Sequence, residues 1–196
     1  MKLTRRKLIV GGTLLGGGLI LGVALTRQKP IPQTVSGSFQ PNAWLQITPD
    51  NKIIFQVDKA EMGQGVTTSL PTIIGEALDY DPANIVIEMA GVHPAYNNPA
   101  MGMQVTGGST SVTTSWIPLS EAGASARYML MAAAAKQWEV SQDELTTDNG
   151  FVIHELSSRR ASYGELSELA KSIPVPETVN LKSKEDYKWV GKDFHR

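Results

Sequence analysis

The chain has 196 residues, of which 41% are hydrophobic, and its formal net charge is −1. This length and composition allow one domain with a substantial apolar core and exclude a disordered tail, while the near-zero charge gives no sign of a nucleic-acid partner. The absence of cysteine excludes disulfides, thiolate nucleophiles, iron–sulfur ligation and cysteine-based zinc sites, and the histidines lie too far apart in sequence for a metal site on one element: His93, His154 and His195.

Residues 1–27 have the charge pattern of an export signal. An uncharged run from Leu8 to Leu25 follows a group of basic residues: Lys2, Arg5, Arg6 and Lys7. The arginine pair resembles a twin-arginine signal, an address for proteins that fold before they cross the membrane. An uncleaved N-terminal anchor is the alternative, because the run is borderline in length for a bilayer and no Ala-x-Ala site follows it. Both interpretations predict a periplasmic protein or one on the periplasmic face of the inner membrane.

A linker and a β-hairpin are expected next. Residues 28–41 are rich in proline, glycine, serine and glutamine, which is typical of a linker, so the folded body is expected to begin near Asn42. Alternating and β-branched residues flank a Pro-Asp-Asn turn at 49–51. This pattern predicts a hairpin with strands at 44–48 and 52–57.

A helix and a third strand complete a β-β-α-β unit. Residues 67–80 place apolar side chains at helical spacing on one face: Leu70, Ile73, Ile74, Ala77 and Leu78. Asp81-Pro82 is predicted to end this helix, and the β-branched run at 84–91 predicts a short strand. We therefore expect a sheet with a helix on one face.

The second half begins with a long loop and continues with helical patterns. Residues 93–114 have no periodicity, and so long a loop inside a compact domain tends to be functional. An alanine-rich helix is predicted at 118–140, with a small-residue face suited to close packing. A hairpin with its turn at 148–150 follows, and then a short helix at 162–173. Its first turn contains a capping box, Ser162 and Glu165.

These elements predict an α+β fold for residues 42–173. It consists of the β-β-α-β unit, the long alanine-rich helix, and a C-terminal hairpin plus short helix. Residues 174–196 form a polar tail, whose alternating charges are typical of a solvated face, with a binding patch as the alternative.

Two glycine-rich loops, each before a helix, are the candidate ligand-binding elements. The first contains Gly63, Gln64 and Gly65, which combine close backbone approach, an amide side chain and the N–H groups at a helix start. The second combines two glycines with hydroxyls that bind a phosphate or a polar ring without formal charge: Thr106, Gly107, Gly108, Ser109, Thr110 and Ser111. Two donor-rich loops in one small domain favour a phosphate-bearing ligand.

Simpler interpretations exist for each loop. A Gly-x-Gly before a helix is often only a turn, and a Ser/Thr-rich loop is often an N-cap and linker. Neither loop is a Walker loop or a dinucleotide fingerprint. Glu61, beside the first loop, fits a strand-end carboxylate as well as a general base. The sequence therefore predicts binding, and no catalytic residue or metal ligand is assigned.

Three stretches are specific enough to indicate a family. They are PNAWLQITPDNKIIFQVDKAEMGQGVTTSLPTIIGEALDYD, the loop NNPAMGMQVTGGSTSV and the helix EAGASARYMLMAAAAKQW. Together they resemble the N-terminal part of the molybdenum-binding subunit of the xanthine dehydrogenase/aldehyde oxidase family, in particular the isoquinoline 1-oxidoreductase β-subunit type. The resemblance covers residues 4–196.

The resemblance implies a cofactor, a reaction and partners. It implies a pocket for molybdopterin cytosine dinucleotide, which carries the molybdenum, lined by two sets of residues: Gly63, Gln64 and Gly65, and Gly107, Gly108, Ser109, Thr110 and Ser111. The implied reaction is hydroxylation of an aldehyde or N-heterocycle carbon with water, and the electrons pass to a [2Fe–2S] subunit.

The chain departs from this family in length. Such subunits are usually several times longer, and the later pterin loops and the catalytic glutamate near their C-terminus have no counterpart here. We therefore expect an N-terminal cofactor-binding segment that is inactive until the remainder of the molybdenum subunit completes it. The alternative is a non-enzymatic exported or membrane-anchored interaction module that keeps the fold.

Overall fold

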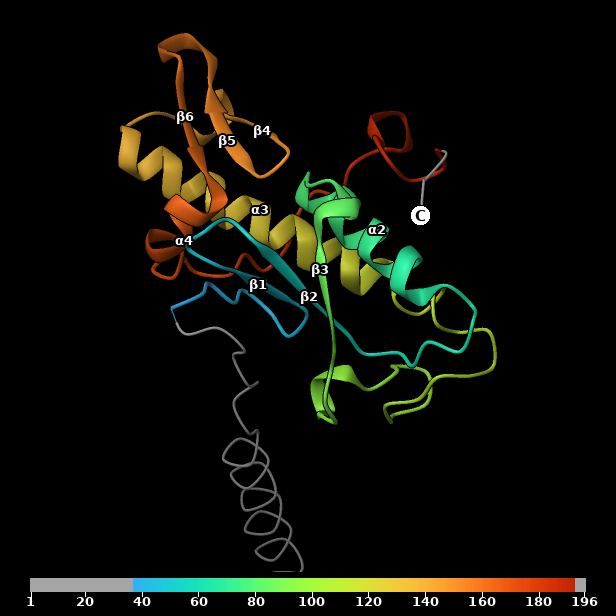
Figure 1. Ribbon diagram of the computed structural model, residues 1–196. Helices are drawn as coiled ribbons and strands as arrows, with labels where there is room; N and C mark the ends of the chain where they lie inside the picture. The colour runs from blue at the N-terminus through green and yellow to red at the C-terminus, as the bar shows by residue number, and fades with distance from the viewer. Residues whose placement is uncertain (1–36, 193–196) are drawn as a thin grey trace, which may run out of the picture. The chain divides into compact units, whose positions relative to one another are not determined.

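The computed structural model describes residues 37–192. They belong to the second of the chain's two compact units, Gln33–Arg196, and the expected export signal or anchor at 1–27 lies outside the described residues. The helices and strands follow one another in this order (Figure 1): β1 (Leu45–Ile47), β2 (Ile53–Val57), α2 (Val66–Leu78), β3 (Val86–Met89), α3 (Trp116–Trp138), β4 (Thr146–Asp148), β5 (Phe151–His154), β6 (Arg159–Ser162) and α4 (Tyr163–Ala170).

The first sheet confirms the predicted β-β-α-β unit. β1 pairs antiparallel with β2, and β3 pairs parallel with the other edge of β2, so the strand order is β1-β2-β3. α2 connects β2 to β3, and all five predicted apolar residues of its inner face are buried. The helix ends two residues before the expected boundary, because Asp79 adopts a left-handed conformation with φ of 63°.

The two long helices pack unusually closely. Ala122, Ala126 and Ala133 on the small-residue face of α3 are buried, as predicted. At Gly123 a Cβ atom would lie 2.6 Å from the carbonyl oxygen of Ile74, which is on α2. Only glycine fits at this crossing without a shift of one helix, so Gly123 sets how closely α2 and α3 approach each other.

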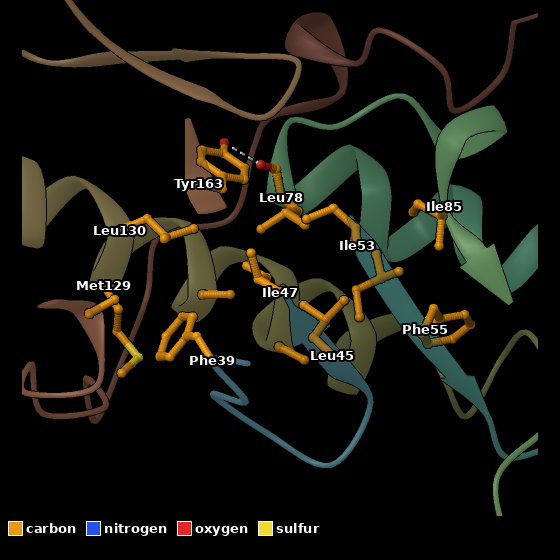
Figure 2. Packing of buried hydrophobic residues seen from close by; sticks show 14 of the residues in the cluster. Phe39, Leu45, Ile47, Ile53, Phe55, Leu78, Ile85, Met129, Leu130 and Tyr163 are labelled. Atoms are coloured by element: carbon orange, nitrogen blue, oxygen red, sulfur yellow. Dashed lines mark hydrogen bonds between the residues drawn. The ribbon is translucent and has the colours of Figure 1, made fainter. Parts of the chain in front are cut away.

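The apolar core joins both halves of the chain. Figure 2 shows side chains from β1, β2, α2, α3 and α4 packed together, among them Leu45, Phe55 and Leu130, each with no exposed surface. Tyr163, the first residue of α4, is also fully buried, and its hydroxyl donates a 2.8 Å hydrogen bond to the carbonyl of Leu78. This bond satisfies the polar end of the tyrosine inside the core.

A second sheet forms from the C-terminal hairpin. β4 and β5 pair antiparallel around Asn149 and Gly150, whose φ angles of 38° and 83° match a hairpin turn. The capping box at the start of α4 is also present. β6, which pairs with β5, was missed because Arg159–Ser162 is short and mostly polar.

The ordered contacts extend beyond the expected ends of the domain. Ser38 and Phe39, in the expected linker, are buried, and Phe39 pairs with Ile47 beside β1. In the tail, the side chain of Lys182 is only 11% exposed and forms ion pairs with Glu76 and Asp79 of the α2 end. Most of the described tail is exposed, as expected of a solvated face, and Lys182 is an exception because buried carboxylates bind it.

Within residues 37–192, no helix is long and apolar enough to cross a membrane.

Candidate functional site

The two glycine-rich loops meet at one end of the first sheet. Since β2 and β3 are parallel, their carboxyl ends lie at the same edge of the sheet. The first glycine loop, residues 60–65, follows β2, and the second glycine loop, residues 106–111, lies in the long segment after β3. The backbone N–H of Ala60 donates a 2.8 Å hydrogen bond to the Thr106 hydroxyl, so the loops are in direct contact. In Figure 1 the segment between β2 and α2 and the segment that leads into α3 run near each other.

Gln104 joins the second loop to both strand ends. Its side-chain amide donates to the carbonyls of Asp58 and Gly91, at 3.4 and 3.3 Å, and its oxygen accepts from the backbone N–H of His93 at 3.2 Å. Asp58 and Gly91 each lie shortly after a strand of the parallel pair. One side chain therefore sets the position of the long loop against the sheet, a role that sequence reasoning missed.

Glu61 occupies the backbone donors at the start of α2. Its carboxylate accepts hydrogen bonds from the N–H groups of Gly63, Gly65 and Thr67 at 2.8, 3.0 and 3.1 Å, and from the Thr67 hydroxyl at 3.0 Å. These bonds, with that from the Thr67 N–H the largest, lower the pKa of Glu61 to about 2. The carboxylate also lies at the positive end of the helix.

This contact bears on how the first glycine loop can bind a ligand. The amides of Gly63 and Gly65 were expected to be available to a phosphate, but an internal carboxylate already holds them. A second anion at this point would face the charge of Glu61. An acidic residue just before a helix start was the available signal, since carboxylates favour that position.

Gln64 closes the first loop on itself. Its side-chain oxygen accepts from the N–H of Met62 at 2.6 Å, and its nitrogen donates to the carbonyl of Ala60 at 2.7 Å. The flanking Gly63 and Gly65 have φ of 97° and 79°, a region that favours glycine. Gln64 is exposed, and the second N–H of its amide has no partner among the described residues. The loop therefore offers a neutral donor to a ligand.

The second loop is built differently, around Thr110. The Thr110 hydroxyl donates to the carbonyl of Gly107 at 2.8 Å and accepts from the side-chain amide of Asn98 at 3.2 Å. Thr110 is therefore an internal support, although the sequence marked it as a ligand-binding hydroxyl. By contrast, the hydroxyls of Ser109 and Ser111 have no partner among the described residues.

Backbone geometry turns this loop outward at its tip. Gly108 and Ser109 have φ of 61° and 56°, and both are exposed. A left-handed conformation costs free energy at serine, and such conformations cluster at binding sites. Neutral hydroxyls and a compact backbone at this tip fit a phosphate or a polar ring better than the first loop does.

No metal centre accompanies the loops. Within the part of the chain that the structure describes, no three His, Cys, Asp or Glu side chains gather in a way that could hold a metal ion.

The fold defines a class of protein, a small α+β domain with two donor-rich glycine loops beyond the carboxyl ends of parallel strands. The family model described as the molybdopterin cofactor-binding domain matches residues 5–195. The chain belongs to this family.

Two curated relatives cover most of the chain. The β subunit of isoquinoline 1-oxidoreductase from Brevundimonas diminuta is 34% identical over 184 residues, which are 91% of this chain and 23% of that protein. A membrane-bound aldehyde dehydrogenase described as pyrroloquinoline-quinone-dependent, from Gluconacetobacter polyoxogenes, is 30% identical over 178 residues, which are 88% of this chain and 22% of that one. The chain thus spans about a quarter of the length of these relatives.

Solved structures support the same fold. Quinoline 2-oxidoreductase from Pseudomonas putida 86 matches 65% of this chain and 16% of its own, with a TM-score of 0.50 and 16% identity. A Cu,Mo-containing CO dehydrogenase matches 63% of this chain and 15% of its own, with a TM-score of 0.50 and 23% identity. At these identities the likeness concerns the fold alone.

Proposed function

We propose that this chain is the N-terminal cofactor-binding segment of an exported molybdenum hydroxylase subunit that oxidises an aldehyde or an N-heterocycle. The observation that carries the proposal is the hydrogen bond from Ala60 to Thr106, which joins the two glycine loops at the carboxyl edge of the parallel strands. Domains of this family bind a molybdopterin cofactor. Its form in this protein is molybdopterin cytosine dinucleotide, which supplies the molybdenum for the oxidation.

The two loops take different parts of this ligand. Ser109, Ser111 and the backbone of Gly107 and Gly108 hold the anionic part, because their donors are neutral and Ser109 and Gly108 are exposed. Gln64 contacts a neutral polar part of the ligand, since the carboxylate of Glu61 beside it repels phosphate. Gly63 and Gly65 provide the turn that presents the Gln64 amide.

Completion by a further polypeptide is the second part of the proposal. The chain spans 23% of its isoquinoline relative. β3 is an edge strand of its sheet, and its apolar side chains are exposed, Ile87 to 38% and Met89 to 55%. Open strand edges and apolar patches of this kind are covered by other chains or segments. The remainder of the molybdenum subunit covers this face, and a small [2Fe–2S] subunit accepts the electrons.

Export completes the proposal. The arginine pair at Arg5-Arg6 directs a protein already loaded with cofactor to the periplasm, where it is released or stays attached to the inner membrane through its N-terminus.

Co-production of this chain with the polypeptide that corresponds to the remaining length of its relatives tests the proposal. We expect a stable complex that contains molybdenum and oxidises an aldehyde or N-heterocycle with an artificial electron acceptor, while the chain alone is inactive. A stable complex without molybdenum would contradict the cofactor assignment. If the remaining polypeptide binds this chain and substitutions in the two glycine loops leave that binding unchanged, the interaction-module alternative is favoured.

A further inference from the structure

A buried ion pair, Asp58 and Lys59, lies directly after β2 and just before the first glycine loop. The ammonium of Lys59 contacts the Oδ2 atom of Asp58 at 2.6 Å, and the two side chains are only 3% and 5% exposed. Removal of two charges from water is costly, and the cost is recovered only when the remaining donors and acceptors of the pair are also satisfied.

This pair keeps unused hydrogen-bonding capacity. The Oδ1 atom of Asp58 is buried and has no donor among the described residues. The Lys59 ammonium carries three N–H groups, and its one hydrogen bond within the described part of the chain goes to Asp58. A buried acceptor and a buried donor therefore stand side by side, and neither has a full set of protein partners among the described residues.

A cavity of about 150 Å³ opens beside the pair. Asp58 and Lys59 line it together with the apolar side chains of Trp44 and Leu119 and the polar side chain of Asn97. A cavity of roughly this volume accommodates a ring the size of benzene, with about six heavy atoms. The walls combine one charged pair with an aromatic ring and an aliphatic side chain, a composition typical of small-molecule sites.

The charges select the ligand chemistry. An inorganic cation faces the Lys59 ammonium and an anion faces the Asp58 carboxylate, so each is repelled by one member of the pair. A neutral molecule with a neighbouring N–H and C=O donates to Asp58 Oδ1 and accepts from Lys59 Nζ at the same time. We propose that this cavity binds a small neutral carboxamide or lactam through the Asp58–Lys59 pair. The site is separate from the glycine-loop residues that the cofactor proposal uses.

Two cyclic probes of the same size, one lactam and one ketone, test this proposal on the full chain. The lactam 2-pyrrolidinone has both N–H and C=O, whereas cyclopentanone has the same number of heavy atoms and no N–H. We expect 2-pyrrolidinone to shift the Trp44 indole N–H resonance in a saturable way, with cyclopentanone at least about tenfold weaker, because a hydrogen bond to a charged acceptor is lost. Equal affinities, or no saturable shift because only water fills the cavity, would overturn the proposal.

A double variant separates binding from folding. Replacement of one partner alone leaves a buried uncompensated charge. Asp58→Leu is therefore combined with Lys59→Met, so that apolar side chains of similar volume replace both charged ones. The matched control is Asp50→Leu with Lys52→Met, an ion pair of 2.7 Å in the exposed β1–β2 turn. If both variants still melt cooperatively, we expect at least a tenfold loss of lactam affinity in the Asp58/Lys59 variant only. A tenfold change in affinity corresponds to about 1.4 kcal/mol of binding free energy. The same loss in the control, or none in either, would contradict the assignment.

Discussion

A carboxylate near each end of α2 accepts hydrogen bonds from backbone N–H groups, Glu61 before the helix and Glu76 within its last turns, but in opposite settings. At the N-terminal end, exposed Glu61 accepts from amides of its own loop, two to six residues away. At the C-terminal end, buried Glu76 accepts from the amides of Lys188, Trp189 and Val190, more than a hundred residues away, and from the ammonium of Lys182.

This difference separates a structural contact from a candidate ligand site. The Glu76 contacts attach the C-terminal segment to the core, and burial makes them expensive to break. The Glu61 contacts are local and solvent-exposed, and they lie beside the second glycine loop, where the hydroxyls of Ser109 and Ser111 have no protein partner within the described residues. The region near Glu61 can therefore exchange partners when a ligand binds, whereas the far end of α2 holds the fold.

Glu76→Gln breaks the contacts at the C-terminal end of α2, and it has the largest expected effect on stability. The substitution removes the charge that the three amides and Lys182 share, so the free energy of unfolding falls by about 3 kcal/mol. Urea denaturation measures this loss, and amide exchange at 188–190 locates it. The control Glu121→Gln changes an exposed residue of α3 and stays within about 0.5 kcal/mol of the parent. Equal stability of the two variants would mean that the tail contact contributes nothing.

Gly123→Ala changes a residue of α3 that lies against α2, where the two helices cross. The added Cβ would lie 2.6 Å from the Ile74 carbonyl oxygen and 2.9 Å from the Ala77 Cβ. Helix propensity alone would stabilise the variant by about 1 kcal/mol, but overpacking reverses the sign, and we expect a net loss of about 1–2 kcal/mol. Thermal denaturation decides the sign. Gly107→Ala, whose Cβ meets no atom within 4 Å, serves as the control and leaves stability unchanged.

Acid titration distinguishes the carboxylates of Glu61 and Glu76, and it has the smallest expected effect because it changes no residue. At Glu76, burial raises the pKa, but hydrogen bonds from Trp189 and its neighbours outweigh burial and keep the pKa below its usual value of 4.5. At Glu61 the pKa falls to about 2. Because both values are lowered by folding, the stability they contribute is present above pH 4.5 and is lost as the pH falls through the folded pKa.

The amide resonances of Gly63 and Gly65 report this titration for Glu61. We expect their proton shifts to change with a midpoint near pH 2 in the parent and to lose this transition in Glu61→Gln. A midpoint near the ordinary value of 4.5 would mean that Glu61 does not hold these amides in solution.

Much of this fold follows from local sequence patterns. The apolar spacing from Leu70 to Leu78 predicts α2, and the Asn149-Gly150 pair predicts the turn of the second hairpin, because each signal lies within one element. The parallel pairing of β2 and β3 follows from the helix between them. That pairing places the carboxyl ends of β2 and β3 at one edge of the sheet, but the return of residues 106–111 to this edge depends on contacts of Gln104 and Thr106 that no sequence pattern predicted.

The partners of the polar side chains were not predictable in the same way. Glu76 binds residues 188–190, and no local pattern links positions so far apart. Thr110 and Ser109 are adjacent in sequence, yet only Thr110 turns inward to support the loop. Such assignments depend on the direction of each side chain after the chain has packed, so the sequence indicated the donor-rich loop but not which of its donors remain available.

Cofactor retention by a loop variant tests the central claim most directly. In the complex with the remaining polypeptide, the bound pterin is measured for Ser109→Ala/Ser111→Ala and for Ser158→Ala. Ser158 is an exposed serine with a left-handed φ of 54°, close to the 56° of Ser109, but it lies in the β5–β6 connection. We expect the affinity for the cofactor to fall about tenfold in the double variant and to stay unchanged in Ser158→Ala, because the former loses hydrogen bonds to an anion. Full retention of pterin by the double variant would contradict the account.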